Sequence, residues 1–337
     1  MLLLAEGHSD DAHYGKTALG VLRYSRDAVV AVLDSERAGS SLDGIPVVAT
    51  VEDALAHDPT VALVGVATAG GRFPPSWRAL LCDCAAAGLD LESGLHERLS
   101  VDPSLVELAR RHGVELRDLR VPPEGLDVPT GANLAHRARV VLTVGTDCAI
   151  GKMTVALELD REARRRGLRS AFVPTGQTGI AIAGWGISVD AVVADFIAGA
   201  SERLVVDGIE RGADFLVVEG QGSLLHPAYA GVTLGLLHGS APHDLVLCHR
   251  AGQTAVDGDE RFPIPPLREV GDLYERVGLL ARPPRVRAIA LNTRGLDDAA
   301  AQSAVDAAEA ATGLPTTDPV RFGAGRLLDA LVSAAKG

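Results

Sequence analysis

Aromatic residues and cysteines are scarce in this chain of 337 residues. Only 4% of the residues are Phe, Trp or Tyr, whereas small and aliphatic residues are abundant. This balance favours an α/β protein with buried parallel strands over a β-sandwich. The four cysteines include one C-x-C pair, Cys82 and Cys84, with no second pair beside it. A structural zinc site is therefore not expected, and the thiols should be reduced in a cytoplasmic protein.

Net positive charge and long apolar runs are also missing. A net charge of −12 repels the phosphates of nucleic acids and offers no basic stripe to a membrane surface. The chain begins MLLLAEGHSDD, and an apolar run this short is neither a signal peptide nor a membrane span. We expect a cytoplasmic protein that acts on a small molecule and contacts neither nucleic acid nor membrane. A homo-oligomer is the default expectation for its assembly.

The length of the chain, with 47% hydrophobic and 23% charged residues, predicts two globular domains. In the first 120 residues, short β-type runs alternate with helical ones, which is typical of a doubly wound, Rossmann-like α/β domain. The expected strands are 28–33, 46–49, 61–67 and 113–119, and the expected helices are 15–22, 51–56, 77–87 and 103–112. Residues 121–138 are rich in Pro and Gly and should link domain 1–120 to a second domain, 139–337.

The second domain opens on a phosphate-loop pattern, typical of a P-loop fold with a parallel sheet. Residues 139–154 read RVVLTVGTDCAIGKMT, a β-type run followed by a glycine-bounded loop and a helix-forming segment. Glycines let backbone N–H groups surround an anion, the helix start adds its positive dipole end, and a lysine neutralises phosphate charge. We therefore expect a phosphate-bearing ligand such as ATP at this loop. The expected contact residues are Gly145, Thr146, Asp147, Cys148, Ala149, Ile150, Gly151, Lys152, Met153 and Thr154.

The loop departs from the best-known phosphate-loop pattern in two places. Five residues rather than four separate Gly145 from Gly151, and Met153 follows Lys152 where a Mg²⁺-binding hydroxyl is expected. Thr154 would then supply that hydroxyl one position later, or the metal would take a water instead. The alternative is an ordinary strand–turn–helix whose glycines only make the turn.

Polar residues follow the other apolar runs of the second domain. Glu219 comes after the run 214–218, and a carboxylate beside a phosphate loop is the arrangement that binds Mg²⁺, although a plain surface acid is the alternative. The segment PTGQTG follows an expected strand at 169–173 and is either a substrate loop or merely flexible. Its candidate substrate contacts are Gln177, Thr178 and Gly179.

His249 and Arg250 follow the run 245–248 and complete the predicted catalytic set with Lys152 and Glu219. Arg250 could bind a carboxylate in bidentate fashion, and His249 is a candidate proton carrier because imidazole titrates near neutral pH. The spacing of the four histidines between residues 226 and 249 fits no zinc pattern.

The loop form GTD-x-x-x-GK resembles the phosphate loop of dethiobiotin synthetase and its ATP-dependent relatives. Glu219, followed by glycine, is similar to the acid of the EGAGG segment in that enzyme. In that group of enzymes, an Asn that follows a late strand of the sheet binds the adenine base. Asn292 follows the run 286–291 and resembles that Asn. A turn-forming Asn is the alternative.

Several segments in one order cover nearly the whole chain: KTALGVLRYS, VATAGGRFPPSWR, GTDCAIGKMT, PTGQTGI, VEGQGSL, LLHGSAPHDLVLCH and ALNT. Together they resemble the DgcN-type family, P-loop proteins with a Rossmann-like N-terminal domain. The resemblance implies that GKMT is normal for the family and that the activity is N-acetylation of D-glutamate from acetyl-CoA. That activity comes from the resemblance alone, because no residue identifies an acetyl group or a D-configured centre.

The residues and the resemblance point to different chemistry. A P-loop with a partner acid predicts ATP and Mg²⁺, whereas transfer from a thioester needs no ATP. One solution is that the loop holds the diphosphate or 3′-phosphate of coenzyme A. Another is an ATP- and Mg²⁺-dependent carboxylate–amine ligase that forms an acyl phosphate, with Lys152 stabilising the transferring phosphoryl group. A nucleotide-gated regulatory module is the third hypothesis.

Overall fold

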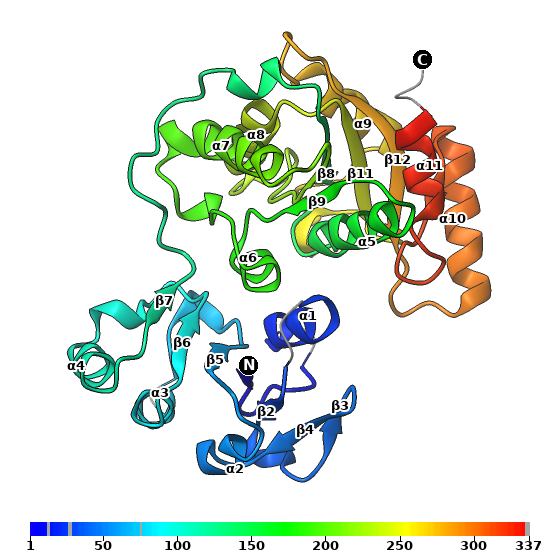
Figure 1. Ribbon diagram of the computed structural model, residues 1–337. Coiled ribbons are helices and arrows are strands. Elements are labelled where there is room, and N and C mark those ends of the chain that lie inside the picture. Colours follow the sequence, from blue (N-terminus) through cyan, green and yellow to red (C-terminus); the bar gives the residue numbers. More distant parts are fainter. Residues whose placement is uncertain (12–13, 26–28, 75, 334–337) are drawn as a thin grey trace. The chain divides into compact units, whose positions relative to one another are not determined.

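The computed structural model describes residues 1–11, 14–25, 29–74 and 76–333 of the chain (Figure 1). They form two compact units, one of residues 1–122 with 180–188 and the other of residues 123–179 with 189–337. Each unit is built on a mostly parallel sheet, so the predicted α/β fold class is confirmed. Residues 123–138, which were expected to be a linker, group with the second unit. No described helix is both long enough and apolar enough to cross a membrane.

The first unit contains a seven-stranded sheet in the order β3-β4-β2-β1-β5-β6-β7, parallel except for the β3–β4 pair. Its strands are β1 (Leu2–Leu4), β2 (Ala31–Leu33), β3 (Ser41–Leu42), β4 (Ile45–Val48), β5 (Val61–Val64), β6 (Asp90–Ser93) and β7 (Leu116–Asp118). Its helices are α1 (Lys16–Tyr24), α2 (Val51–Leu55), α3 (Trp77–Ala86) and α4 (Pro103–His112), with 3-10 turns η1 (Ser35–Arg37), η2 (Ala69–Gly71) and η3 (Leu99–Val101).

Local chemistry explains several of these bounds. Thr50 and Asp53 form a reciprocal capping box at the start of α2, and the Asp102 carboxylate caps α4 with proline in its first turn. Gly113 ends α4 in the left-handed conformation. Sequence reasoning missed β1 and β6, because β1 is only three residues of one apolar run and β6 alternates acidic with buried residues. Residue 28 of the expected strand 28–33 lies outside the described residues.

The second unit contains a six-stranded parallel sheet in the order β13-β12-β11-β8-β10-β9. Its strands are β8 (Arg139–Gly145), β9 (Ser170–Val173), β10 (Phe215–Val218), β11 (Asp244–Arg250), β12 (Arg285–Asn292) and β13 (Thr316–Thr317). Its helices are α5 (Lys152–Arg165), α7 (Ile197–Glu210), α8 (Ala230–Ser240), α9 (Leu267–Arg276), α10 (Asp298–Thr312) and α11 (Gly325–Ser333). The helix α6 (Gln177–Ala183) begins in this unit, but from residue 180 onward it groups with the first unit. Its 3-10 turns are η4 (Ala132–Ala135), η5 (Val189–Ala191), η6 (Ala194–Phe196) and η7 (Val256–Gly258).

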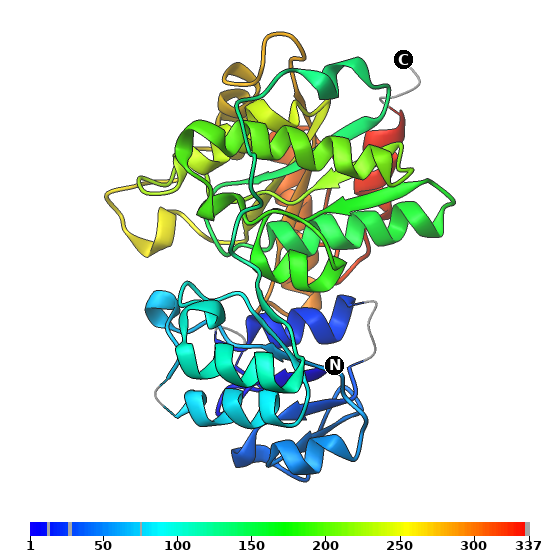
Figure 2. The same ribbon diagram turned by 60° about the vertical axis from the view of Figure 1, so that its left-hand side comes forward.

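Helices cover both faces of this sheet, α7 and α8 on one and α5 and α11 on the other (Figures 1 and 2). The two helices α7 and α8 approach closely because α8 presents glycines, and a Cβ on Gly239 would collide with the backbone of Ala198. Because all strands are parallel, the loops after β8 to β12 emerge at one edge of the sheet. That edge carries the predicted site residues.

One predicted element differs in this unit. The segment PTGQTG was expected to be a loop, but Gln177 already begins α6. The turns η5 and η6 follow, and the helix α7 begins at Ile197.

Candidate functional site at the phosphate loop

The loop between β8 and α5 has the backbone of an anion cradle. Ala149 has φ 52° and Gly151 has φ 110°, both in the left-handed region that lets successive N–H groups face one concavity. Among the described residues, no protein acceptor takes the N–H groups of Ala149, Ile150 and Gly151. The first turn of α5 follows directly and adds the positive end of its dipole.

Lys152 is buried at the start of α5, with 6% of its surface exposed. Its Nζ donates a hydrogen bond to the carbonyl of Asp147, 2.6 Å away within the same loop. Burial lowers the pKa of Lys152, and the nearby Cys248, Cys148, Asp147 and Glu219 side chains act in the opposite direction. A buried ammonium whose acceptor is a neutral carbonyl is a strong site for an anion.

Asp147 ties the phosphate loop to the segment after β11. Its Oδ2 accepts hydrogen bonds from the Gln253 side chain and from the Asp257 N–H, each at 2.6 Å. Its Oδ1 accepts the N–H of Cys148, also at 2.6 Å. The Asp147 side chain therefore fixes the shape of the loop.

His249 and Thr146 join the loop to β11. The Thr146 hydroxyl and Nδ1 of His249 lie 2.9 Å apart, and both side chains are buried. Burial lowers the pKa of His249 to about 4, so this imidazole is neutral at physiological pH. Arg250, the next residue, is exposed, and its guanidinium has no partner among the residues that the structure describes. Arg250 is thus available to an anionic ligand, whereas His249 supports the loop.

Asn292 lies at the end of β12 and holds the loop from the other side. Its Nδ2 donates to the carbonyl of Ile150 (3.0 Å), and its Oδ1 accepts the N–H of Arg294 (3.0 Å). Both ends of the amide are used by the protein, so recognition of adenine by Asn292 would require these bonds to break. That predicted role stays a prediction.

Glu219 follows β10, which is the neighbour of β8 in the sheet. Only 6% of the residue is exposed, and its Oε2 accepts the N–H groups of Thr175 (2.9 Å) and Gly176 (3.1 Å). A Cβ on Gly179 would collide with the same oxygen, so only glycine fits beside the carboxylate. Burial raises the pKa of Glu219 to about 7, although the two N–H groups and Lys152 oppose this rise.

The remaining predicted residues lie around these groups. Gln177, Thr178 and Gly179 form the first turn of α6, next to the N–H groups that hold Glu219. The side chain of Gln177 is half-buried and makes no hydrogen bond with the described protein atoms. Met153 and Thr154 are half-buried in the first turn of α5. The predicted Mg²⁺ pair, Thr154 with Glu219, stays a prediction.

Tyr274 is a site residue that sequence reasoning missed. Its buried hydroxyl donates to the carbonyl of Gly145 (2.7 Å) and accepts the N–H of Leu224 (3.1 Å). It thus bridges the phosphate loop to the loop after β10. Burial raises the pKa of Tyr274 to about 12, so the hydroxyl keeps its proton. No sequence signal marks it, because 129 positions separate Tyr274 from Gly145.

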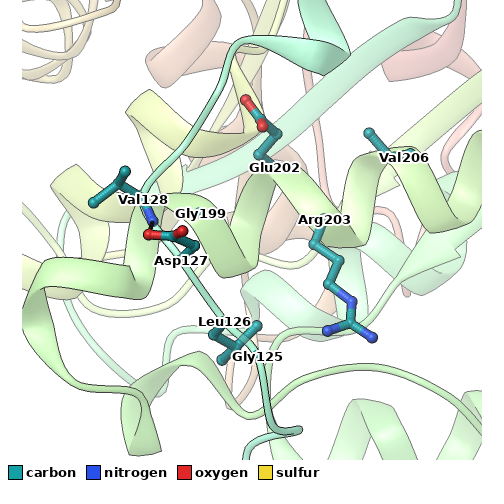
Figure 3. A pocket seen from close by; sticks show the side chains of 8 residues that line it. All are labelled: Gly125, Leu126, Asp127, Val128, Gly199, Glu202, Arg203 and Val206. Carbon is teal, nitrogen blue, oxygen red and sulfur yellow. Dashed lines mark hydrogen bonds between the residues drawn. The ribbon is translucent and has the colours of Figure 1, made fainter.

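A cavity of about 210 Å³ lies away from this site, between residues 125–128 and α7 (Figure 3). Glu202, on its wall, accepts hydrogen bonds from the N–H groups of Thr130 (2.8 Å) and Gly131 (2.6 Å). No predicted site residue lines this cavity. The hydrogen bonds of Glu202 to Thr130 and Gly131 fix the position of the chain segment that leads into β8.

Two family models match the chain. Residues 34–122 match the DUF1611_N Rossmann-like domain, and residues 127–328 match the DUF1611_C P-loop domain, both described as domains of unknown function. The chain belongs to the DUF1611 family. A crystal structure of a DUF1611 family protein from Anabaena variabilis has a TM-score of 0.91 and 44% sequence identity, and the match covers 98% of both chains.

Two curated relatives of this DUF1611 protein carry the name D-glutamate N-acetyltransferase. The relative from Tritonibacter scottomollicae is 38% identical over 332 residues, which is 98% of this chain and 98% of the relative. The relative from a Pseudoalteromonas species is 36% identical over 262 residues, 77% of this chain and 78% of the relative. The family predicted from the sequence segments is confirmed, together with its Rossmann-like and P-loop domains. The names of the relatives indicate an enzyme.

Proposed function

We propose that this protein transfers an acetyl group from acetyl-CoA to the amino group of an amino acid of the D-glutamate type. The names of the curated relatives support this reaction class. The observation that carries the proposal is the pairing of a buried carboxyl of pKa about 7, Glu219, with the cationic cradle of Lys152 at one sheet edge. Acyl transfer to an amine needs a proton acceptor and a site for negative charge, and these groups supply both.

The chemistry assigns a role to each group. The amine nitrogen attacks the thioester carbonyl, the C–S bond breaks, and the ammonium of the amino acid must lose its protons. A carboxylate with a pKa near 7 is matched to that task, so Glu219 acts as the general base. Arg250 is free to bind a carboxylate of the amino acid, and Gln177 and Thr178 contribute polar contacts from α6.

The cradle of Lys152 and the N–H groups after Cys148 binds negative charge in this reaction. That charge is either a phosphate of coenzyme A or the carbonyl oxygen of the acyl group as it becomes an oxyanion. Both choices keep Lys152 essential. They differ in where the thioester lies relative to the loop.

An ATP-dependent carboxylate–amine ligase is the second candidate. The position of Glu219 on the strand next to the phosphate loop favours it, because this is where P-loop enzymes place a Mg²⁺-binding acid. A hydroxyl and a carboxylate oxygen are donors of the type that Mg²⁺ takes, so Thr154 and Glu219 would hold the ion. When bound, the ion would neutralise phosphate charge.

A product assay on the purified protein separates the candidates. D-Glutamate and other amino acids are incubated with acetyl-CoA alone, and in parallel with ATP, Mg²⁺ and a free acid. Lys152→Ala tests the cradle, and Lys16→Ala, an exposed lysine at the start of α1, is the matched control. We expect N-acetyl product with acetyl-CoA alone and loss of product only in Lys152→Ala.

Other outcomes would replace the proposal. Product that requires ATP and releases ADP would identify a ligase. Binding of nucleotide without product under any condition would favour the regulatory module.

A further inference from the structure

A cysteine, a histidine and an aspartate meet beside the cradle. The Sγ of Cys148, a ring nitrogen of His226 and a carboxylate oxygen of Asp147 all lie within 4.8 Å of one another. Cys148 and Asp147 belong to the phosphate loop, whereas His226 comes from the loop after β10. His226 is 8% exposed, and its ring lies 4.5 Å from the ring of Tyr229, so its position is fixed by packing.

The hydrogen bonds of this cluster do not fit a metal site. Both carboxylate oxygens of Asp147 already accept hydrogen bonds, three in all. Nδ1 of His226 accepts the N–H of Ala228 at 3.1 Å. A neutral imidazole that accepts at Nδ1 carries its proton at Nε2, so its second nitrogen donates a hydrogen bond and does not ligate a metal. A ring nitrogen of His226 lies within 4.8 Å of the Cys148 sulfur, although no hydrogen bond joins these two side chains in the described structure. The Nε2–H is therefore the group by which His226 would stabilise a thiolate at Cys148.

The backbone places Cys148 where a nucleophile of acyl transfer belongs. The thiol is half-buried, and the next three residues provide the N–H groups that no described protein atom accepts. A nucleophile that directly precedes such donors can attack a carbonyl whose oxygen they bind. Burial raises the pKa of the Cys148 thiol, the neighbouring Lys152 ammonium acts against that rise, and the carboxylates of Asp147 and Asp257 add to it.

We propose that Cys148 carries the acetyl group as a thioester between coenzyme A and the amino acid. This inference rests on the proposed acetyl transfer and adds a covalent step to it. The Cys148 thiol releases its proton to water, and its sulfur attacks the acetyl carbonyl. A C–S bond to Cys148 forms, the C–S bond to coenzyme A breaks, and the departing sulfur takes the electron pair and a proton from water. The neutral amine then attacks the acetyl carbonyl, the C–N bond of the amide forms, and the C–S bond to Cys148 breaks. The Cys148 sulfur leaves with the electron pair and takes the proton that the nitrogen loses.

Within this mechanism the N–H cradle is the oxyanion site, and His226 is a positioning residue. The loop then binds the thioester end of acetyl-CoA and not its phosphates. His226 acts only through Cys148, because its Nε2–H donates a hydrogen bond to the thiolate.

Mass spectrometry tests the acetyl-cysteine directly. The protein is mixed with acetyl-CoA without amino acid, quenched in acid and digested. We expect one added acetyl group on the peptide that contains Cys148, and its loss when D-glutamate is added before the quench. Cys148→Ala should lower product formation by roughly two orders of magnitude or more, and the matched control Cys82→Ala in α3 should keep it.

Two outcomes separate this inference from the proposed function. If N-acetyl product forms while no acetyl group is found on Cys148 and Cys148→Ala keeps its rate within a few-fold, the covalent step is wrong and the acetyltransferase stands. If no protein variant and no amino acid gives product, the proposed function itself fails. Thermal unfolding of each variant shows whether a lost rate reflects a lost fold.

Alkylation by iodoacetamide tests the role of His226 without a requirement for catalysis. The rate at Cys148 is followed against pH by peptide mass. His226→Phe keeps a ring against Tyr229 but removes the N–H donor, so the pH midpoint of alkylation should rise by about one unit. His226→Gln restores an N–H donor and should bring the midpoint back. An unchanged midpoint in His226→Phe would show that His226 does not act on the thiol.

Discussion

Glu219→Gln tests the charge state of the buried carboxyl on which the proposed chemistry depends. Burial raises the pKa of this side chain from its ordinary value of 4.5 to about 7 in the folded protein. A difference of about 2.5 pH units corresponds to about 3 kcal/mol of unfolding free energy. Glutamine has the same shape and can still accept the N–H groups of Thr175 and Gly176 through its carbonyl oxygen.

The sign follows from proton binding. A carboxyl whose pKa is higher in the folded state than in the unfolded chain binds its proton more tightly when the protein is folded. Its contribution to stability is complete below pH 4.5 and is lost as the pH rises through 7. Glu219→Gln removes this loss, because an amide does not titrate. The variant should therefore gain stability relative to the wild type as the pH rises.

Urea unfolding of both proteins, followed by far-UV circular dichroism, measures this difference. Between about pH 5 and about pH 8, the unfolding free energy of the variant minus that of the wild type should increase by about 2 to 3 kcal/mol. Any change in unfolding free energy that the substitution causes equally at both pH values cancels in this comparison. A difference that stays constant with pH, or that falls, would refute a raised pKa and with it the use of Glu219 as a base near neutral pH.

Activity gives the second readout of the same variant. Glu219→Gln should lose at least about a hundredfold in product formation if the carboxylate is the general base. Glu202→Gln is the matched control, because Glu202 is also a buried carboxylate that accepts two backbone N–H groups but lies at the distant cavity. Its variant should keep the rate of acetyl transfer.

Three further substitutions test the surroundings of the site. Tyr274→Phe removes the hydrogen bond to Gly145 and should lower the unfolding free energy by about 1 to 3 kcal/mol in urea titrations. Gly179→Ala forces a methyl group against the Glu219 carboxylate and should lower both the melting temperature and the rate. Arg250→Ala should raise the KM for the amino acid by about tenfold or more and leave the melting temperature unchanged, because its guanidinium has no partner in the described structure.

Two of these variants have a matched control, and the kinetics of Arg250→Ala test the third. Tyr229→Phe removes the hydroxyl of a residue that is 53% exposed and should leave stability unchanged. Gly231→Ala adds a methyl group that meets no atom within 4 Å, so it should be neutral or slightly stabilising within α8. If Arg250→Ala changed kcat and left KM unchanged, Arg250 would not bind the amino-acid carboxylate. Equal effects of Gly179→Ala and Gly231→Ala would show that the contact with Glu219 is unimportant.

The sequence by itself determined the features that a short stretch of chain encodes. The phosphate loop was visible because strand, glycines, lysine and helix start are consecutive from Arg139 to Lys152. The capped helix α4 was predicted with its observed bounds, since a capping aspartate, a first-turn proline and a terminal glycine are local signals. The family was recognisable for the same reason, because its segments keep their order along the chain.

Only the tertiary structure decided how these parts become a site. Sequence reasoning placed Glu219 and His249 near the loop, but it did not show that Glu219 turns its carboxylate to α6 or that His249 bonds Thr146. These contacts depend on β8 lying between β10 and β11, and long-range neighbours of this kind leave no local pattern.

The same reason explains the residues that were missed. Nothing in the sequence of α9 distinguishes Tyr274 from its neighbours. The spacing of His226 from the other histidines fits no metal-binding pattern. The fold brings the first to the carbonyl of Gly145 and the second to the thiol of Cys148, over 129 positions in the first case. The local chain chemistry specified an anion-binding loop, and the order of strands in the sheet specified the acid, the thiol and the imidazole that surround it.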